Sequence, residues 1–300
     1  MIKIILGIFL SVTIYSKGDD LTATNILQKS KEAYESLKYY QSSGVVSAHV
    51  NGSTIPTEFV VKLIPPYSYQ IMWRLKVPGV SQFKQTGAVW NSDGDAYLYM
   101  SMINSYSKLE TDYMALSAAT GISNGAAFTI PALALDTFSS QPSPFSQLIN
   151  PKLVKKESVF GEECYLVSGS TQSSKEVSYW FSVESFLLRK IRRSYEKNHT
   201  AKKIPKDVSN EEIKSMLKEL GQEISEEKIK AMKELLKKST ILIDIKGFSE
   251  ETHNKISLAP LTKEDLSYKV PRGAILKKSL FENMFQKLPK HNHPHTYPKK

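Results

Sequence analysis

The sequence lacks most features that stabilise a fold covalently or support catalysis. Its single cysteine, Cys164, cannot form an internal disulfide, so the fold depends on its hydrophobic core. Cys164 lies in a strand-like stretch with no histidine close in sequence, which favours a small buried hydrophobic role. We find no phosphate-binding glycine loop, no zinc-type Cys/His spacing and no carboxylate pair suited to acid–base chemistry. We therefore expect no enzyme, no cofactor and no metal site.

The apolar run at the N-terminus is too short to span a bilayer comfortably. Residues 4–14 follow Lys3 and precede small or polar residues and Asp19-Asp20. This order predicts a signal peptide over residues 1–18, although Ile14 and Ser16 match an Ala-x-Ala cleavage site poorly. A buried N-terminal strand is the alternative. No cysteine ends the run to carry a lipid anchor, so we expect a soluble, exported protein.

Acidic residues are scarce at the C-terminus, although the whole chain has a net charge of only +10. Residues 269–300 contain eight lysines and arginines but only one acidic residue, Glu282. Such a tail favours contact with anionic lipid head groups, each charge contributing about 1 kcal/mol. Nucleic acid is the rival partner, and predicted export argues against it. Alternating His291, His293 and His295 offer metal ligands, but we expect this tail to bind none.

Strand-like segments rich in tyrosine and tryptophan dominate the first half of the chain. Residues 59–63, 67–75 and 97–100 alternate between large apolar positions and others, which places one set of side chains on each face of a sheet. We predict a mainly β fold with helices, in which a curved sheet encloses an apolar hollow suited to a lipid chain. Ordinary core packing is the alternative for each aromatic residue, and a one-residue slip would invert the set. The candidate lining residues are Phe59, Val61, Tyr69, Ile71, Trp73, Trp90, Tyr97, Tyr99 and Trp180.

An apolar helical stretch, residues 113–135, interrupts the strands and is placed to cover the sheet. Thr111 can cap its first helix, residues 121–125 break it, and Pro131 limits regular helix in the second part. A further amphipathic helix is predicted at residues 21–37.

The charged stretch 197–238 predicts a helical hairpin inserted between two strands. Its helices begin at a Ser209/Glu212 capping box and at Ser225. We read it as a solvated flap, with a partner-binding surface as the alternative. The predicted organisation is a signal peptide (1–18), a half-barrel domain (19–196 plus 239–275), the insertion (197–238) and a basic tail (276–300).

Several motifs in order resemble the lipoprotein-carrier superfamily of bacterial envelopes (LolA and LolB, with the related outer-membrane lipoprotein-sorting proteins). The resemblance covers about residues 21–196 and 240–274. It rests on SGVV at 43–46, IPP at 64–66, WNSDGDAYLY at 90–99, YWFSVESFLLRK at 179–190 and LSYKVPRGA at 266–274.

The resemblance implies an incomplete, strongly curved antiparallel barrel plugged by helices, located in the periplasm. In that family the hollow receives acyl chains of lipids or lipoproteins and releases them to a membrane acceptor. Gly121 and Gly125 would let the lid swing, with Phe128, Ile130 and Leu133 as lid residues. The carrier proper has an arginine before the strand-ending proline that ties down the lid, whereas this chain has Ile64. We expect a monomer that binds lipid or lipoprotein and contacts a membrane or membrane acceptor transiently.

Two alternatives remain at this stage. The first is an envelope sensor or protein-interaction module on the same fold, with the insertion as its contact surface. The second is a serine hydrolase, because residues 121–125 match G-x-S-x-G around Ser123, with His199 or His253 as nominal bases. That chemistry needs the serine on a turn from a strand into a helix, and the preceding segment is helical in composition.

Overall fold

The computed structural model describes residues 21–50, 52–76, 84–198, 209–219, 224–239 and 244–280. The predicted signal peptide, His199 and residues 281–300 of the predicted tail lie outside these ranges. The helices are α1 (Ala23–Glu35), α2 (Asp112–Ile122), α3 (Thr129–Ala134), α4 (Asn210–Glu219), α5 (Glu226–Ser239) and α6 (Lys263–Leu266), with short 3-10 turns η1 (Ser101–Ile103) and η2 (Asp136–Phe138).

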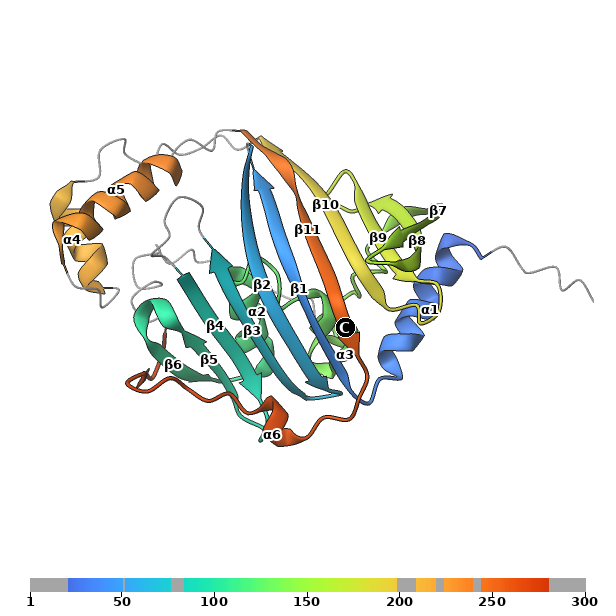
Figure 1. The fold of residues 1–300 in the computed structure, drawn as a ribbon, viewed down its shortest axis with the longest axis horizontal. Helices are drawn as coiled ribbons and strands as arrows, with labels where there is room; N and C mark the ends of the chain where they lie inside the picture. The colour runs from blue at the N-terminus through green and yellow to red at the C-terminus, as the bar shows by residue number, and fades with distance from the viewer. Residues whose placement is uncertain are drawn as a thin grey trace, which may run out of the picture.

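The strands form one sheet. They are β1 (Tyr40–Val50), β2 (Ser53–Ile64), β3 (Ser68–Lys76), β4 (Lys84–Asn91), β5 (Ala96–Met100), β6 (Ser105–Leu109), β7 (Ile149–Val159), β8 (Glu162–Ser170), β9 (Val177–Ser182), β10 (Leu188–Asn198), β11 (Asp244–Ser257) and β12 (Ile275–Leu276). Over the described ranges this sheet has 12 strands in the order β12-β6-β5-β4-β3-β2-β1-β11-β10-β9-β8-β7 (Figure 1). All neighbours pair antiparallel except β12 with β6. Because β12 and β7 are edges, the curved sheet does not close, and the predicted incomplete barrel is confirmed.

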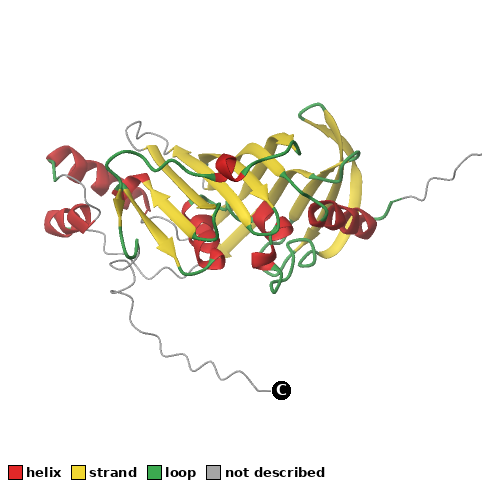
Figure 2. Ribbon diagram, turned by 90° about the horizontal axis from the view of Figure 1, so that it is seen from below, coloured by secondary structure: helices red, strands yellow, loops and turns green. Residues whose placement is uncertain are grey.

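The two faces of the sheet have different covers. Helices α1, α2 and α3 pack on the concave face. In Figure 1, α2 and α3 lie behind the strands and α1 stands at the right of the sheet; in Figure 2 all three lie along the lower side of the strands. On the convex face, Tyr268, Val270 and Ala274 of the C-terminal segment pack against Trp90 and Tyr99. We call residues 262–280 the strap; its β12 pairs with β6 and forms one edge of the sheet. The main core therefore lies between the concave face and its helices.

Local signals in the sequence explain several of these elements. A turn at Asp93-Gly94 joins β4 to β5, with Gly94 at a φ of +92° that suits glycine. At Gly44 the strand β1 approaches β11 so closely that an added Cβ would lie 1.7 Å from the Thr252 carbonyl oxygen.

The charged insertion contains the expected helical hairpin. The Ser209/Glu212 capping box is present, with the Ser209 hydroxyl accepting from the Glu212 amide at 3.2 Å. Ile213, Leu217 and Ile229 bury their side chains against one another. The hairpin stands between β10 and β11, whose end residues Asn198 and Asp244 are paired directly. In Figure 1 it lies to one side of the sheet.

No helix in the described parts of the chain combines the length and the apolar character needed to cross a membrane.

Candidate functional site

The concave face of the sheet is apolar because alternate residues of neighbouring strands point the same way. On the paired strands β2 and β3, the side chains of Phe59, Val61, Ile71 and Trp73 are all at most 3% exposed. β4 and β5 add Val89 and Leu98, and β9 adds Tyr179 and Phe181 to the same core. This strip is the apolar wall that the strand pattern predicted.

Two short helices, rather than a second sheet, cover this apolar wall. We call α2, α3 and the turn between them (residues 112–134) the plug. The side chains through which the plug contacts the strands are mostly small, so its backbone approaches the strands closely. The apolar side chains that it buries in the main core are those of Ala115, Leu116, Ala119, Ala126, Ala127 and Ile130. The hollow predicted from the sequence is therefore filled by the chain's own plug in this conformation.

Hydrogen bonds at two points hold the plug to the strands. At the start of α2, Asp112 Oδ1 accepts from the Tyr69 hydroxyl and from the Asn91 amide, both at 2.8 Å. Burial, reinforced by the negative charge of Asp112, raises the pKa of Tyr69 well above its ordinary value. In the turn between the helices, Asn124 donates to the Thr57 hydroxyl at 3.0 Å. This turn places Asn124 and Gly125 in the left-handed region, with φ of 55° and 95°.

The three predicted lid residues occupy different surroundings on the plug. Ile130 faces the sheet and is 1% exposed. Leu133 is half-buried and lines a groove beside α3. Phe128 packs edge-on against Phe138, and both line a smaller pocket of about 250 Å³. Whether these residues form a moving lid stays a prediction.

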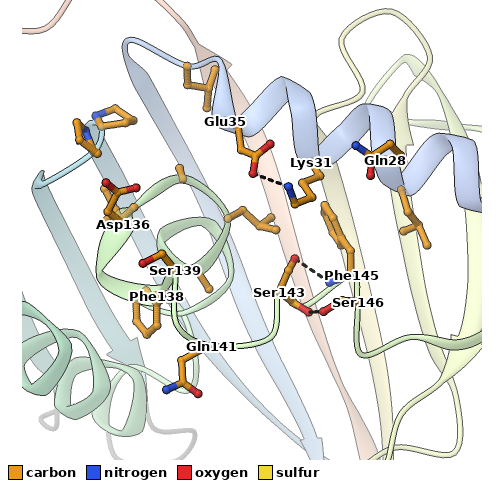
Figure 3. A pocket seen from close by; sticks show the side chains of 18 of the residues that line it. Gln28, Lys31, Glu35, Asp136, Phe138, Ser139, Gln141, Ser143, Phe145 and Ser146 are labelled. Carbon is orange, nitrogen blue, oxygen red and sulfur yellow. Dashed lines mark hydrogen bonds and ion pairs between the residues drawn. The ribbon is translucent and has the colours of Figure 1, made fainter.

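An open groove of about 900 Å³ runs between α1 and the segment that follows the plug (Figure 3). Leu27, Leu133 and Phe145 contribute apolar wall, and the ion pair of Lys31 with Glu35, 2.5 Å apart, lies on the α1 side. The volume falls within the range of about 300–1,000 Å³ usual for small-molecule sites. Because Leu133 and Ala134 of α3 line it, the groove borders the plug directly.

The nine predicted lining residues lie on both faces of the sheet. Five of them are on the concave face: Phe59, Val61, Tyr69, Ile71 and Trp73. The other four, Trp90, Tyr97, Tyr99 and Trp180, are on the convex face. Lipid contact by any of the nine stays a prediction, but those four do not line the hollow.

The predicted set is divided between the two faces because aromatic residues on the convex face are also packed against other side chains. Trp90 stacks on Tyr97 with ring centroids 5.3 Å apart and packs on Tyr268 of the strap at 5.0 Å. Trp180 packs with Val159, Cys164 and Leu166. Aromatic bulk therefore does not identify the inner face. The concave-face residues that the prediction left out, such as Val89 and Leu98, are the sequence neighbours of these convex aromatic residues. They stand at the alternate positions of the same strands, and this alternation is the signal that points to them.

A buried polar cluster lies on the concave face under the start of α3. The carboxylate of Glu251 on β11 is 4% exposed, and its Oε2 accepts from the Thr129 hydroxyl at 2.8 Å. Arg193 on β10 has one guanidinium nitrogen 3.6 Å from that oxygen and donates from another to the Thr129 hydroxyl at 3.3 Å. His253 Nε2 lies 3.2 Å from Glu251 Oε1, and Nδ1 of the same ring lies 3.2 Å from the Ser42 hydroxyl. Sequence reasoning missed this cluster.

The cluster keeps a negative charge inside the fold. Burial raises the pKa of Glu251, but the hydrogen bond from His253 and the charges of His253 and Arg193 outweigh it, so its pKa is lowered overall. Since an ionised carboxylate only accepts hydrogen bonds, Thr129 and His253 donate to it.

The hydrolase motif has no catalytic geometry in this conformation. Ser123 ends a helix, is fully buried, and its hydroxyl accepts from the Ala127 amide at 3.3 Å. The strand-to-helix turn that such a serine requires is therefore absent at this position. Ser42, His253 and Glu251 form a chain of polar contacts, but Ser42 is 1% exposed, which leaves no room for a substrate at its hydroxyl.

Comparison with known proteins found similarity at the level of structure. No family model matches the sequence, and no curated protein matches it. The structure is similar to that of LprF from Mycobacterium bovis, with 14% identity, a TM-score of 0.40, and 84% of this chain and 97% of that chain covered. A LolA superfamily protein from Nitrosomonas europaea shares 13% identity at a TM-score of 0.29, covering 83% and 98%. The Pseudomonas aeruginosa MucA/MucB complex gives 11% identity and a TM-score of 0.39, covering 82% and 61%.

One of these structures is named as a LolA superfamily protein, the superfamily that the sequence resembles, but at these identities and TM-scores the matches carry no argument about the role of this chain. The likeness concerns the fold alone, so the function has to follow from the residues of this chain.

Proposed function

We propose that this protein binds acyl chains of lipids or lipoproteins on the concave face of its sheet, without covalent chemistry. The observation that carries this proposal is the way the apolar wall is closed. Its cover is a plug of two short helices, bordered by an open groove of about 900 Å³. A ligand that displaced α3 would find the wall formed by Phe59, Val61, Ile71 and Trp73.

The energetics favour such an exchange. Burial of an acyl chain contributes about 0.8 kcal/mol per methylene, so ten methylenes would contribute about 8 kcal/mol. This gain offsets the loss of the plug's own contacts, of which several involve only alanine. The closer these two terms are in size, the more readily the ligand is released to an acceptor.

The setting of this activity is part of the proposal. We infer that the protein is exported to the periplasm as a monomer and passes its cargo on within the cell envelope. The lysine-led apolar run at residues 4–14 and the basic C-terminus support export and contact with an anionic membrane surface.

A charge placed in the groove tests the site. Leu37, which follows α1 and does not belong to the plug, lines the groove, whereas Leu258 is 49% exposed and is not among the groove residues. We expect Leu37→Glu to weaken binding of a fluorescent fatty acid by about tenfold or more, because a carboxylate next to an acyl chain is poorly solvated. Leu258→Glu carries the same change and is expected to bind as the unaltered protein does.

Native mass spectrometry of protein purified from its own host provides the second measurement. We expect co-purifying lipid. Protein that is repeatedly free of lipid and takes up no fluorescent fatty acid would refute the proposal.

A protein-interaction module that senses envelope state is the second candidate. The observation that favours it is the α4–α5 hairpin, which has its own apolar cluster and lies beside the sheet rather than over the concave face. A partner that binds the whole protein but not a version without the hairpin would support this role.

A further inference from the structure

The buried cluster under α3 contains a hydrogen-bonding position that the plug itself fills. The Thr129 hydroxyl donates to Glu251 at 2.8 Å and lies within hydrogen-bonding distance of Arg193 at 3.3 Å. It therefore acts as donor and acceptor at one point on an otherwise apolar wall. Thr129 is the first residue of α3, so any movement of α3 away from the sheet removes this hydroxyl.

Loss of that hydroxyl would leave the carboxylate incompletely satisfied. Glu251 would keep His253 on one oxygen, but its other oxygen would have only Arg193, at 3.6 Å. A buried charged acceptor without a donor is strongly unfavourable. A ligand that replaces α3 must therefore supply a donor at the same point or leave the cluster unsatisfied.

The cluster also has a route toward solvent. The side chain of Arg193 is 28% exposed, whereas that of Glu251 is 4% exposed. A polar group bound between them would have its acyl chain on the apolar wall and its remaining substituents on the Arg193 side. This arrangement suits one end of an amphipathic ligand.

We infer that Glu251 and Arg193, supported by His253, form a subsite for the polar group of the ligand. The subsite selects a group that both donates and accepts a hydrogen bond, namely a hydroxyl or an amide. In the closed protein Thr129 occupies the place of that group. This inference rests on the proposed acyl-chain function and adds the chemistry by which ligands are distinguished.

Two probes with the same chain test this selectivity. Dodecanol donates and accepts, whereas methyl dodecyl ether accepts only and is slightly more apolar. In competition with a fluorescent fatty acid, we expect the full-length protein to bind dodecanol at least about tenfold more tightly than the ether. Discrimination of this kind arises because the analogue leaves a buried group unpaired.

Three variants separate the subsite from the closure of the plug. Glu251→Met removes the acceptor, so the preference for dodecanol should fall to within about twofold. Thr129→Val weakens only the closed state, so both probes should bind more tightly while their ratio stays unchanged. Thr57→Val removes the hydrogen bond from Asn124, a plug contact away from Glu251, and should act as Thr129→Val does.

The outcomes distinguish the two levels of the argument. Binding of both probes with equal affinity, or a preference that survives in Glu251→Met, would overturn the subsite and leave acyl-chain binding intact. Failure of every probe to bind would overturn both. If Glu251→Met does not fold, the ratio measured on the unaltered protein and on Thr129→Val still decides.

Discussion

Truncating a plug side chain tests whether the plug is displaced when a ligand binds. Ile130 on α3 is 1% exposed and belongs to the main core. Ile130→Ala removes three buried carbon atoms, which contribute about 0.8 kcal/mol each, so the contact loses about 2 kcal/mol. If binding displaces the plug, this loss falls on the closed state alone. The apparent affinity for a fatty acid then rises by up to about thirtyfold, since about 1.4 kcal/mol corresponds to a factor of ten.

Ile71→Ala is the matched control, because it makes the same chemical change on the sheet side of the contact. Ile71 on β3 is fully buried and belongs to the wall in both the closed and the open state. Its truncation should lower the free energy of unfolding by about 2–5 kcal/mol and remove ligand contact, so affinity should not rise.

The assay combines a fluorescent fatty-acid titration, urea unfolding and hydrogen exchange over residues 123–134. We expect Ile130→Ala to speed exchange in the plug without a comparable change in the strands. The reasoning fails if both variants lower affinity together while the plug continues to exchange as slowly as the strands. The plug would then be a permanent part of the core.

Three further predictions follow from individual features. Replacing residues 199–243 by an Asn-Gly turn should leave the free energy of unfolding within about 1 kcal/mol and acyl binding unchanged, because Asn198 and Asp244 already pair; lost binding would place the insertion in the site. Burial, with the charge of Glu162 adding to it, raises the pKa of Cys164 to about 11, so its thiol should be inert to a disulfide reagent at pH 8 until urea unfolds the protein; rapid labelling of native protein would contradict this. Folding lowers the pKa of Glu251, so its ionisation stabilises the protein at a pH above the pKa of the unfolded chain, about 4.3. This contribution is lost as the pH falls below that value. Glu251→Gln should therefore destabilise the protein at pH 7 but much less at pH 3, as measured by urea unfolding.

Local features of the fold were predictable because they depend on neighbouring residues. Thr111 caps α2 by accepting from the Met114 amide at 3.1 Å, and the Ser209/Glu212 capping box starts α4, both as the sequence indicates. The hairpin at Asp93-Gly94 follows from the conformational freedom of glycine in the same way. The period of two in the strands likewise predicted a sheet with one apolar face.

The candidate site was only partly predictable, because its residues come together through long-range pairing. Ser42, Arg193 and Glu251 stand on β1, β10 and β11, and only the register of these three strands places them under Thr129. In the sequence, Glu251 is one acidic residue in a polar stretch, and nothing in the local pattern indicates that it is buried.

The sequence by itself determined where strands and helices form, since capping, turn chemistry and alternation act over a few residues. Only the tertiary structure decided which face of each strand became the wall. That choice depends on what covers each face: the plug packs over Phe59 and Ile71, while the strap covers Trp90 and Tyr99. The plug and the strap, which lie far apart in the chain, therefore determine which residues line the concave face and which lie on the convex face. The size of the side chains does not.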